Sequence, residues 1–186
     1  MEKLRELLSE KRFAHTMNVA KAAKELADIY GCDKEKAYLA ALLHDITKEF
    51  TKEQHFELIE KGNVKLTEIE RTTQSLWHSI TAPVYARLNL GIEDEDILNA
   101  IRYHTTGREN MSTFEKIIFT ADCISDDRSY PELDEVRSLA FTDLDAAVLA
   151  KLKYAIEFLV KKDRPICGDT VSAYNELVMK KNERTE

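Results

Sequence analysis

The chain has 186 residues, of which 44% are hydrophobic and 33% are charged, with only 5 glycines and 3 prolines. This composition suits one soluble, helix-rich domain with a substantial core, and it argues against disorder or a barrel with many tight turns. A net charge of -7 excludes broad binding to nucleic acid or to an anionic membrane through bulk electrostatics.

The first two predicted helices lie close to the N-terminus. Apolar residues recur at helical spacing over 12–30, and Gly31 supplies a left-handed stop. Asp33 can cap a second helix, which is rich enough in alanine and leucine to be central in a bundle. This second helix is expected to end at the adjacent pair His44 and Asp45.

The next stretch predicts two more helices with a connection between them. Thr51 and Gln54 resemble a capping box that begins a short helix to about residue 60. Residues 61–74 then have the composition of a polar connection. A further helix is expected over 75–88, with Pro83 close enough to its start to bend or delay it.

The second half of the chain continues the helical pattern. An acidic first turn begins a helix that carries His104 near its end, before Gly107. Ser112 and Glu115 form another capping box, which opens a helix that contains Asp122.

Beyond Pro131 the amphipathic pattern returns three times, over 132–140, 144–161 and 170–180. We find no internal repeat and no linker. The sequence therefore predicts one all-α domain over 1–186. Its core spans about 12–125, and the C-terminal helices of 132–180 pack on that core as a cover.

Four of the five histidines and two aspartates form a series of potential metal ligands, namely His15, His44, Asp45, His78, His104 and Asp122. Imidazoles and carboxylates together suit Zn, Fe, Mn and related divalent ions. The pair at 44–45 follows an apolar run at a helix end, where it can face a cleft between helices. Taken alone, the pair could also be a C-terminal histidine stabilised by the helix dipole and a surface turn aspartate. The other four positions favour the metal site.

The remaining reactive side chains are given structural roles. We expect His55 to be an ordinary histidine on a helix surface, and Trp77 to belong to the core or to a pocket wall rather than to stack on a base. Cys32, Cys123 and Cys167 are odd in number and lack Cys-x-x-Cys spacing, so they indicate neither disulfides nor a thiolate zinc site. Cys123 is expected to be buried.

Targeting signals are not visible in the sequence. No apolar run reaches the roughly 20 residues of a membrane span, and the charged start of the chain is unlike a secretion signal. A cytoplasmic protein is the expectation, with no membrane partner.

The order His, His-Asp, Asp is similar to the signature of the HD superfamily of helical metal-dependent phosphohydrolases, and "HDITK" resembles its His-Asp-x-x-Lys form. The segments "RFAHTMNVAKAAKELADIYG", "YHTTGR", "ADCIS" and "TVSAYNEL" resemble the bacterial YqeK family of symmetrical dinucleoside tetraphosphate hydrolases. This resemblance covers about 12–177 and implies an HD-domain helical bundle.

The resemblance also implies two divalent metals that share one carboxylate. One ion has the ligands His15, His44, Asp45 and Asp122. The other is held by His78 and His104, together with Asp45 as a bridge. Six protein ligands are too many for one catalytic ion with an open position, but they suit two hexacoordinate ions. The resemblance favours iron, with Mn, Co and Zn as alternatives.

The implied reaction is the cleavage of a dinucleoside tetraphosphate, such as diadenosine tetraphosphate, into two nucleoside diphosphates. A hydroxide between the metals is the expected nucleophile, because two metals lower the pKa of a bridging water and neutralise phosphate. Asp45 and Lys48 are the predicted catalytic residues. The predicted substrate contacts are Lys48, Thr105, Thr106 and Arg108. The alternative is that Lys48 is a solvated lysine, that the two threonines form a helix cap and that Arg108 is a loop charge.

The chain departs from the family pattern in two places. Ser79 stands after His78, where the family often has glycine, and "SDDR" stands where the family often has Glu-Pro before its arginine. Neither change removes a predicted ligand, and the role of Arg128 is left open.

Three other functions remain open at this stage. The chain could be an HD-type nucleotidase or deoxynucleotide phosphohydrolase with the same metals, a non-catalytic nucleotide sensor, or a helical interaction domain without metal. A small nucleotide is the expected partner, without nucleic acid, and a homodimer is left open.

Overall fold

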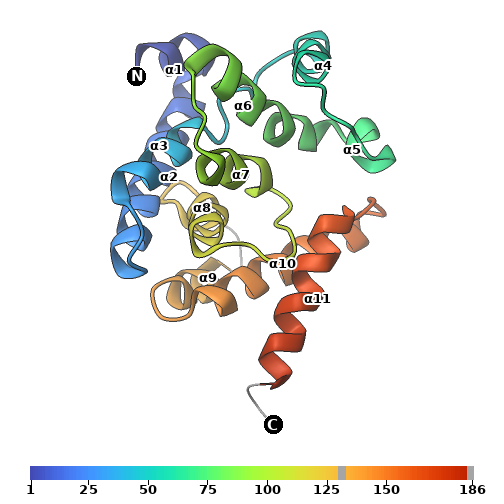
Figure 1. Cartoon of the computed structure of the whole chain (residues 1–186). Helices are drawn as coiled ribbons and strands as arrows, with labels where there is room; N and C mark the ends of the chain where they lie inside the picture. Colours follow the sequence, from blue (N-terminus) through green and yellow to red (C-terminus); the bar gives the residue numbers. More distant parts are fainter. Residues whose placement is uncertain (130–132, 184–186) are drawn as a thin grey trace.

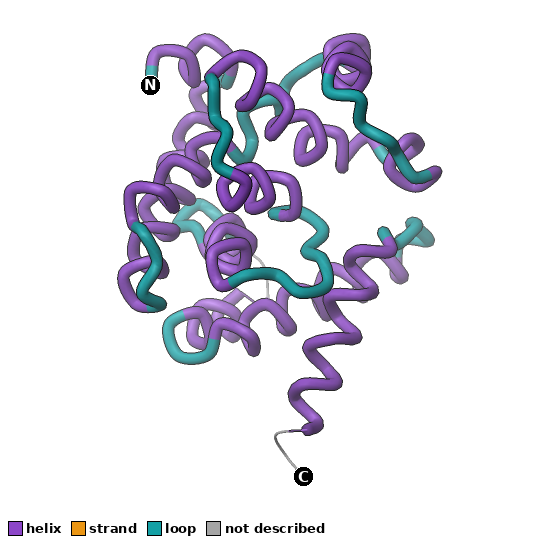
Figure 2. Tube along the Cα trace, viewed as in Figure 1, coloured by secondary structure: helices purple, strands orange, loops and turns teal. Residues whose placement is uncertain are grey.

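Helices follow one another along residues 1–129 and 133–183, the part of the chain that the computed structural model describes (Figure 1). In these residues the structure has eleven helices: α1 (Glu2–Leu7), α2 (Glu10–Ile29), α3 (Lys34–Leu43), α4 (Lys52–Lys61), α5 (Glu68–Thr72), α6 (Gln74–Leu90), α7 (Glu95–Tyr103), α8 (Thr113–Ile124), α9 (Leu133–Ala140), α10 (Leu144–Lys161) and α11 (Gly168–Glu183). Figure 2 shows that turns and loops alone join them within the described residues. The predicted all-α architecture is confirmed.

Side chains just before the helices fix where several of them begin. Asp33 accepts hydrogen bonds from two backbone N–H groups at the start of α3. Thr51 with Gln54 and Ser112 with Glu115 form the two expected capping boxes, which begin α4 and α8. Each box satisfies backbone N–H groups that have no partner inside the helix.

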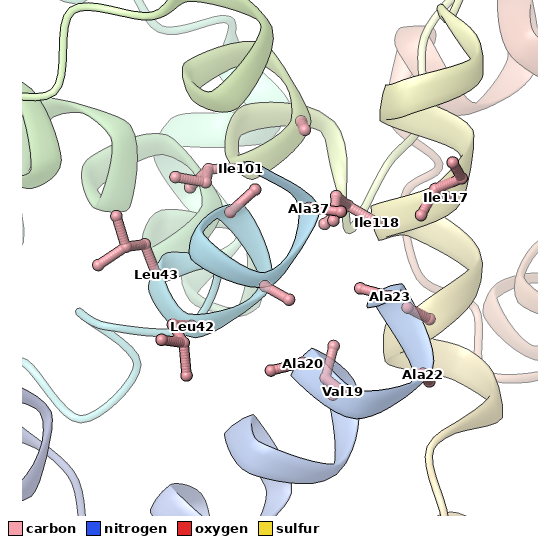
Figure 3. Close-up of a cluster of buried hydrophobic side chains, with 14 of the residues drawn as sticks. Val19, Ala20, Ala22, Ala23, Ala37, Leu42, Leu43, Ile101, Ile117 and Ile118 are labelled. Atoms are coloured by element: carbon pink, nitrogen blue, oxygen red, sulfur yellow. The ribbon is translucent and has the colours of Figure 1, made fainter. Parts of the chain in front are cut away.

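The main core lies where α2, α3, α7 and α8 meet (Figure 3). Val19, Ala20 and Ala23 of α2 are fully excluded from solvent, as is Ala37 of α3. Because alanine has a small side chain, the backbones of α2 and α3 can approach closely. Ile118 of α8 closes the core from the other side, and α3 is central in the bundle as its composition predicts.

The region before His78 differs from the expectation in two ways. The segment expected to be a polar connection contains helix α5, which Thr67 and Glu70 begin with a third capping box. Helix α6 begins at Gln74, and Pro83 lies in its interior rather than near its start. The prediction that Pro83 delays this helix was therefore wrong, because packing of α6 against α4 and α7 outweighs the local cost of the proline.

The prediction of a surface position for His55 was also wrong. Its side chain is buried, and Nδ1 lies 2.8 Å from Oγ1 of Thr81. His55 shares a face of α4 with Leu58 and Ile59, three and four residues later, and all three are buried. Trp77 is buried as expected, and its indole N–H donates to the backbone of α5.

The C-terminal helices pack beside α8. Helix α10 contacts α8, α9 and α11, and α11 extends away from the rest of the bundle (Figure 1). Residue 132, where the first of these helices was expected to begin, lies outside the described residues. Cys123 is buried as expected. In the described part of the chain, no helix has the length and apolar character that a membrane crossing requires.

Two aliphatic residues of α2 test the contribution of the core. We expect Leu26→Ala to lower the free energy of unfolding by about 2–5 kcal/mol, because truncation of a fully buried leucine removes apolar burial and leaves a cavity. Ile29, on the same helix, is 50% exposed, so Ile29→Ala should change the free energy of unfolding by less than about 0.5 kcal/mol. Urea denaturation followed by circular dichroism measures both. Equal effects of the two changes would contradict the core assignment.

Candidate metal centre

His44 caps the C-terminus of α3, and the chain turns sharply after it. The N–H of Ile46 donates to the carbonyl of Leu43, and the N–H of Lys48 to that of Asp45. The Nδ1–H of His44 donates to the carbonyl of Ala41 at 2.6 Å. This bond satisfies a carbonyl at the helix end and leaves the lone pair of Nε2 free.

His104 repeats this arrangement at the end of α7. Its Nδ1–H donates to the carbonyl of Ile101 at 2.7 Å, again three residues earlier. Both histidines are therefore held as the tautomer that presents an unprotonated Nε2 to the same interior space. The expected helix-terminal role of His44 and the expected ligand role are compatible, because they use different ring nitrogens.

Asp45 directs its two carboxylate oxygens to different neighbours. Its Oδ1 is 3.2 Å from Nε2 of His78 and 3.6 Å from Nε2 of His104, and these two nitrogens are 3.2 Å apart. Its Oδ2 is 3.7 Å from Nε2 of His44, which lies 3.9 Å from Oδ1 of Asp122. Asp45 therefore joins two groups of donors into one cluster.

His15 brings the last of the predicted ligands from α2. Its Nε2 is 3.2 Å from Oδ1 of Asp122, and its Nδ1 is 2.8 Å from Oδ2 of Asp127. When Nδ1 donates its proton to Asp127, a neutral His15 turns a lone pair toward the carboxylate of Asp122. Two acceptors at this distance need a cation or a second proton between them.

The pKa values of the cluster follow from burial and charge. Burial lowers the pKa of His44 to about 4, so its imidazole is neutral at pH 7. Burial and the nearby Lys48 hold the pKa of His78 well below its usual value. Burial alone would raise the pKa of Asp122, but a hydrogen bond from His15 and neighbouring positive charges outweigh it and hold that pKa well below the usual range. Burial alone would lower the pKa of His15, but the hydrogen bond and charge of Asp122 and the charge of Asp127 outweigh it and raise that pKa. His44 and His78 thus offer neutral imidazoles and Asp122 an ionised carboxylate, the forms that bind metals.

The cluster fits a divalent cation. Nε2 of His44 and Oδ1 of Asp45 are buried without a hydrogen-bond partner, although such atoms are nearly always satisfied in folded proteins. Oδ1 has close neighbours, but none has hydrogen-bond geometry toward it. The residues form two possible ligand sets, and within each set the donor atoms all lie within 4.8 Å of one another. One set is His15, His44 and Asp122, and the other is His44, Asp45 and His104. The C-termini of α3 and α7 add negative partial charge.

Four cationic side chains surround the cluster. Nζ of Lys48 is 2.8 Å from Nε2 of His78 and 3.3 Å from Oδ1 of Asp45. Arg128 donates to Oδ1 of Asp122 at 2.6 Å, and Arg12 lies 3.5 Å from Oδ2 of Asp45. The ammonium of Lys151 on α10 donates to the backbone carbonyl of Phe119 and lies 3.9 Å from Oδ2 of Asp122.

The sequence interpretation left the role of Arg128 open and did not include Arg12, Asp127 or Lys151 in the site. Asp127 and Arg128 stand within a few residues of Asp122, so their closeness in sequence was a usable signal. Lys151 gave no such signal, because it reaches the site only when α10 folds against α8.

A cavity of about 800 Å³ opens beside the cluster. Its polar end is lined by His15, Asp122, Arg128 and Lys151, and its other end reaches apolar side chains of α10. The C-terminal helices therefore do more than cover the core. A cationic end next to an apolar end suits a ligand that is part anion and part apolar ring.

Two of the four predicted substrate contacts line this cavity. Thr105 and Thr106 line it, and Oγ1 of Thr105 is 3.0 Å from Nε2 of His104. Arg108 instead donates two hydrogen bonds to Glu115, at 2.7 and 3.0 Å.

Ser79, which stands where the family often has glycine, is buried within α6. Its hydroxyl donates to the carbonyl of Leu76 at 2.9 Å. The helix continues regularly past this position, and His78 reaches the cluster.

The chain is similar to known proteins over nearly its whole length. Residues 12–127 match the model of the HD domain. The symmetrical bis(5'-nucleosyl)-tetraphosphatase of Halalkalibacterium halodurans is 44% identical over 172 residues, which cover 92% of this chain and 91% of that protein. The protein of the same name from Bacillus subtilis is 40% identical over 175 residues, 94% of each chain.

A solved structure agrees with these relatives. The crystal structure of a predicted HD superfamily hydrolase involved in NAD metabolism from Clostridium acetobutylicum superposes with a TM-score of 0.93 at 37% identity, covering 96% of this chain and 95% of that one. Fold, motif and sequence similarity agree, and the chain belongs to the HD-domain family and, within it, to the family of the symmetrical bis(5'-nucleosyl)-tetraphosphatases.

Proposed function

We propose that this chain is a metal-dependent hydrolase that cleaves dinucleoside tetraphosphates, with diadenosine tetraphosphate as the type substrate, into two nucleoside diphosphates. The observation that carries the proposal is the convergence of six imidazole and carboxylate side chains in one cluster, two of which, His15 and Asp122, line the adjacent cavity. The printed activity of the relatives in Halalkalibacterium halodurans and Bacillus subtilis supports the choice of substrate.

Membership of the HD family implies a divalent metal. We propose the ligands His15, His44, Asp45 and Asp122 for one ion, and Asp45, His78 and His104 for a second. The two oxygens of Asp45 have different histidine neighbours, which supports its role as the bridge. When bound, such ions neutralise phosphate oxygens and lower the pKa of a coordinated water. Iron is the proposed metal, with Mn, Co and Zn as alternatives.

The side chains around the metals bind and orient the substrate. Lys48 is the proposed catalytic lysine, since its ammonium lies beside Asp45 where it can neutralise a phosphate oxygen. Thr105 and Thr106 line the cavity, which supports their contact with phosphate. Arg108 remains a proposed contact, and it would first have to leave Glu115.

The nearest alternative is an HD enzyme that acts on a mononucleotide, and no observation favours it over a dinucleotide substrate. A sensor without turnover would be expected to have lost ligands, and the closeness of all six candidate side chains favours an enzyme. The absence of nucleic-acid binding stays a prediction, which a binding assay with nucleic acid can test. The homodimer stays open, and light scattering measures the oligomeric state.

The first prediction of the proposed function concerns metal content and products. Protein purified without oxygen should hold about two metal ions per chain, because six donors suit two ions. With diadenosine tetraphosphate it should release ADP alone. Elemental analysis and chromatography measure these results, with NAD, deoxynucleoside triphosphates and AMP as competing substrates. Products that include AMP and ATP, or faster turnover of a competitor, would contradict the proposal.

The second prediction compares two buried histidines. His15→Ala should lose bound metal and lower kcat by at least about 100-fold, more than the loss of a residue that only supports a ligand. His55→Ala is the matched control, because His55 is buried outside the cluster, and it should keep both metals and turnover while losing stability. Metal analysis, kinetics and thermal denaturation separate the two variants. Full metal content in His15→Ala would remove His15 from the ligand set.

The third prediction concerns Asp127, which holds Nδ1 of His15. Asp127→Asn can still accept this hydrogen bond but removes the charge that favours the required tautomer, so metal affinity should fall by about 10- to 100-fold. Asp126→Asn is the control, since Asp126 pairs with the exposed Lys21 instead. Competition with a chelator measures the affinity. Equal affinity for both variants would show that Asp127 does not support the site.

A further inference from the structure

One face of α10 forms a wall of the cavity, although α10 lies outside the residues that match the HD domain. Lys151, Ala155 and Phe158 line the cavity at intervals of four and three residues, the spacing that puts side chains on one side of a helix. Leu159 extends this face. We call these four residues the α10 wall.

The α10 wall begins at the metal centre with Lys151. Its ammonium is within hydrogen-bond distance of the carbonyls of Phe119 and His104, and these bonds use two of its three donors. It lies close to Asp122 and lines the cavity. A charge held in this way is placed to meet a phosphate that binds beside the metals.

The other end of the α10 wall is apolar. Phe158 is 47% exposed and stands beside Leu159, and Pro165, in the connection after α10, also lines the cavity. An exposed phenylalanine ring in a hollow offers a face on which a flat ring can stack. Phe158 follows Lys151 by seven positions in the sequence, which is about 10 Å along a helix. This span is comparable with that from a polyphosphate to the base of the same nucleotide.

We propose that the α10 wall is the nucleoside-recognition surface of this enzyme, with a nucleobase stacked on Phe158 while the attached phosphates meet Lys151 and the metal centre. This inference rests on the proposed function and adds to it the residues that select a nucleotide over a bare polyphosphate. A nucleotide is the occupant that matches a cavity with metal ligands and cations at one end and an open aromatic ring at the other.

The space next to this wall supports a substrate with two nucleosides. A second hollow of about 540 Å³ shares Thr73, Ser75, Leu159 and Pro165 with the cavity lining and adds Arg164. The lining of the α10 wall therefore continues into a second hollow at the same end of α10.

Calorimetric titration of the metal-loaded protein with ADP and with inorganic tripolyphosphate tests the α10 wall. Phe158→Ala should bind ADP about 5- to 150-fold more weakly, the loss of one stacked base, and should bind tripolyphosphate as the wild type does. Lys151→Met should weaken both ligands. Val160→Ala is the control, since Val160 is 59% exposed on the same helix and outside the lining, and it should weaken neither.

The outcomes separate this inference from the proposed function. If Phe158→Ala weakens ADP and tripolyphosphate equally, or weakens neither, the base does not stack there and the inference is overturned, even when diadenosine tetraphosphate is cleaved to ADP. If the wild type cleaves no dinucleoside polyphosphate but Phe158→Ala still loses ADP selectively, the nucleoside wall stands and the proposed reaction fails. A variant with altered circular dichroism is replaced by Phe158→Leu, which keeps apolar bulk but loses the flat ring.

Discussion

The placement of two carboxylates at one point in the bundle is the constraint on which the site depends. Asp45 is buried and Asp122 is half-buried at the edge of the cavity, where an unpaired charge is expensive. Positive charge reaches them from several parts of the chain, through Lys48, Arg128 and Lys151. Even so, one oxygen of Asp45 has no hydrogen-bond partner. The cluster therefore suits a cation with more charge than a lysine or arginine side chain, and a divalent ion has that charge.

The C-terminal ends of α3 and α7 fix the orientation of two candidate ligands. His44 and His104 each close a helix by donating Nδ1–H to a carbonyl of the last turn. The same bond that completes the helix fixes the tautomer, so the backbone does the work that a separate supporting side chain does for His15. Local helix geometry and ligand chemistry are thus satisfied by the same residues.

The division of the cavity bears on how HD enzymes differ. The part of the chain that matches the HD domain supplies all six candidate ligands. One wall of the cavity comes from α10, with Lys151 close to Asp122 and Phe158 about two turns further along the helix. The proposed nucleoside surface therefore comes from α10, whereas the candidate ligands and the proposed phosphate contacts Lys48, Thr105 and Thr106 lie in the HD-matching segment.

The sequence by itself determined the features that depend on near neighbours. Helix starts at Asp33 and Ser112 could be predicted because a cap bonds to N–H groups two or three residues away, and the candidate ligands could be proposed from their type and order. Only the tertiary structure decided that the buried His55 contacts Thr81 and that Lys151 approaches Asp122. These contacts join helices far apart in the sequence, and the packing that creates them leaves no local pattern.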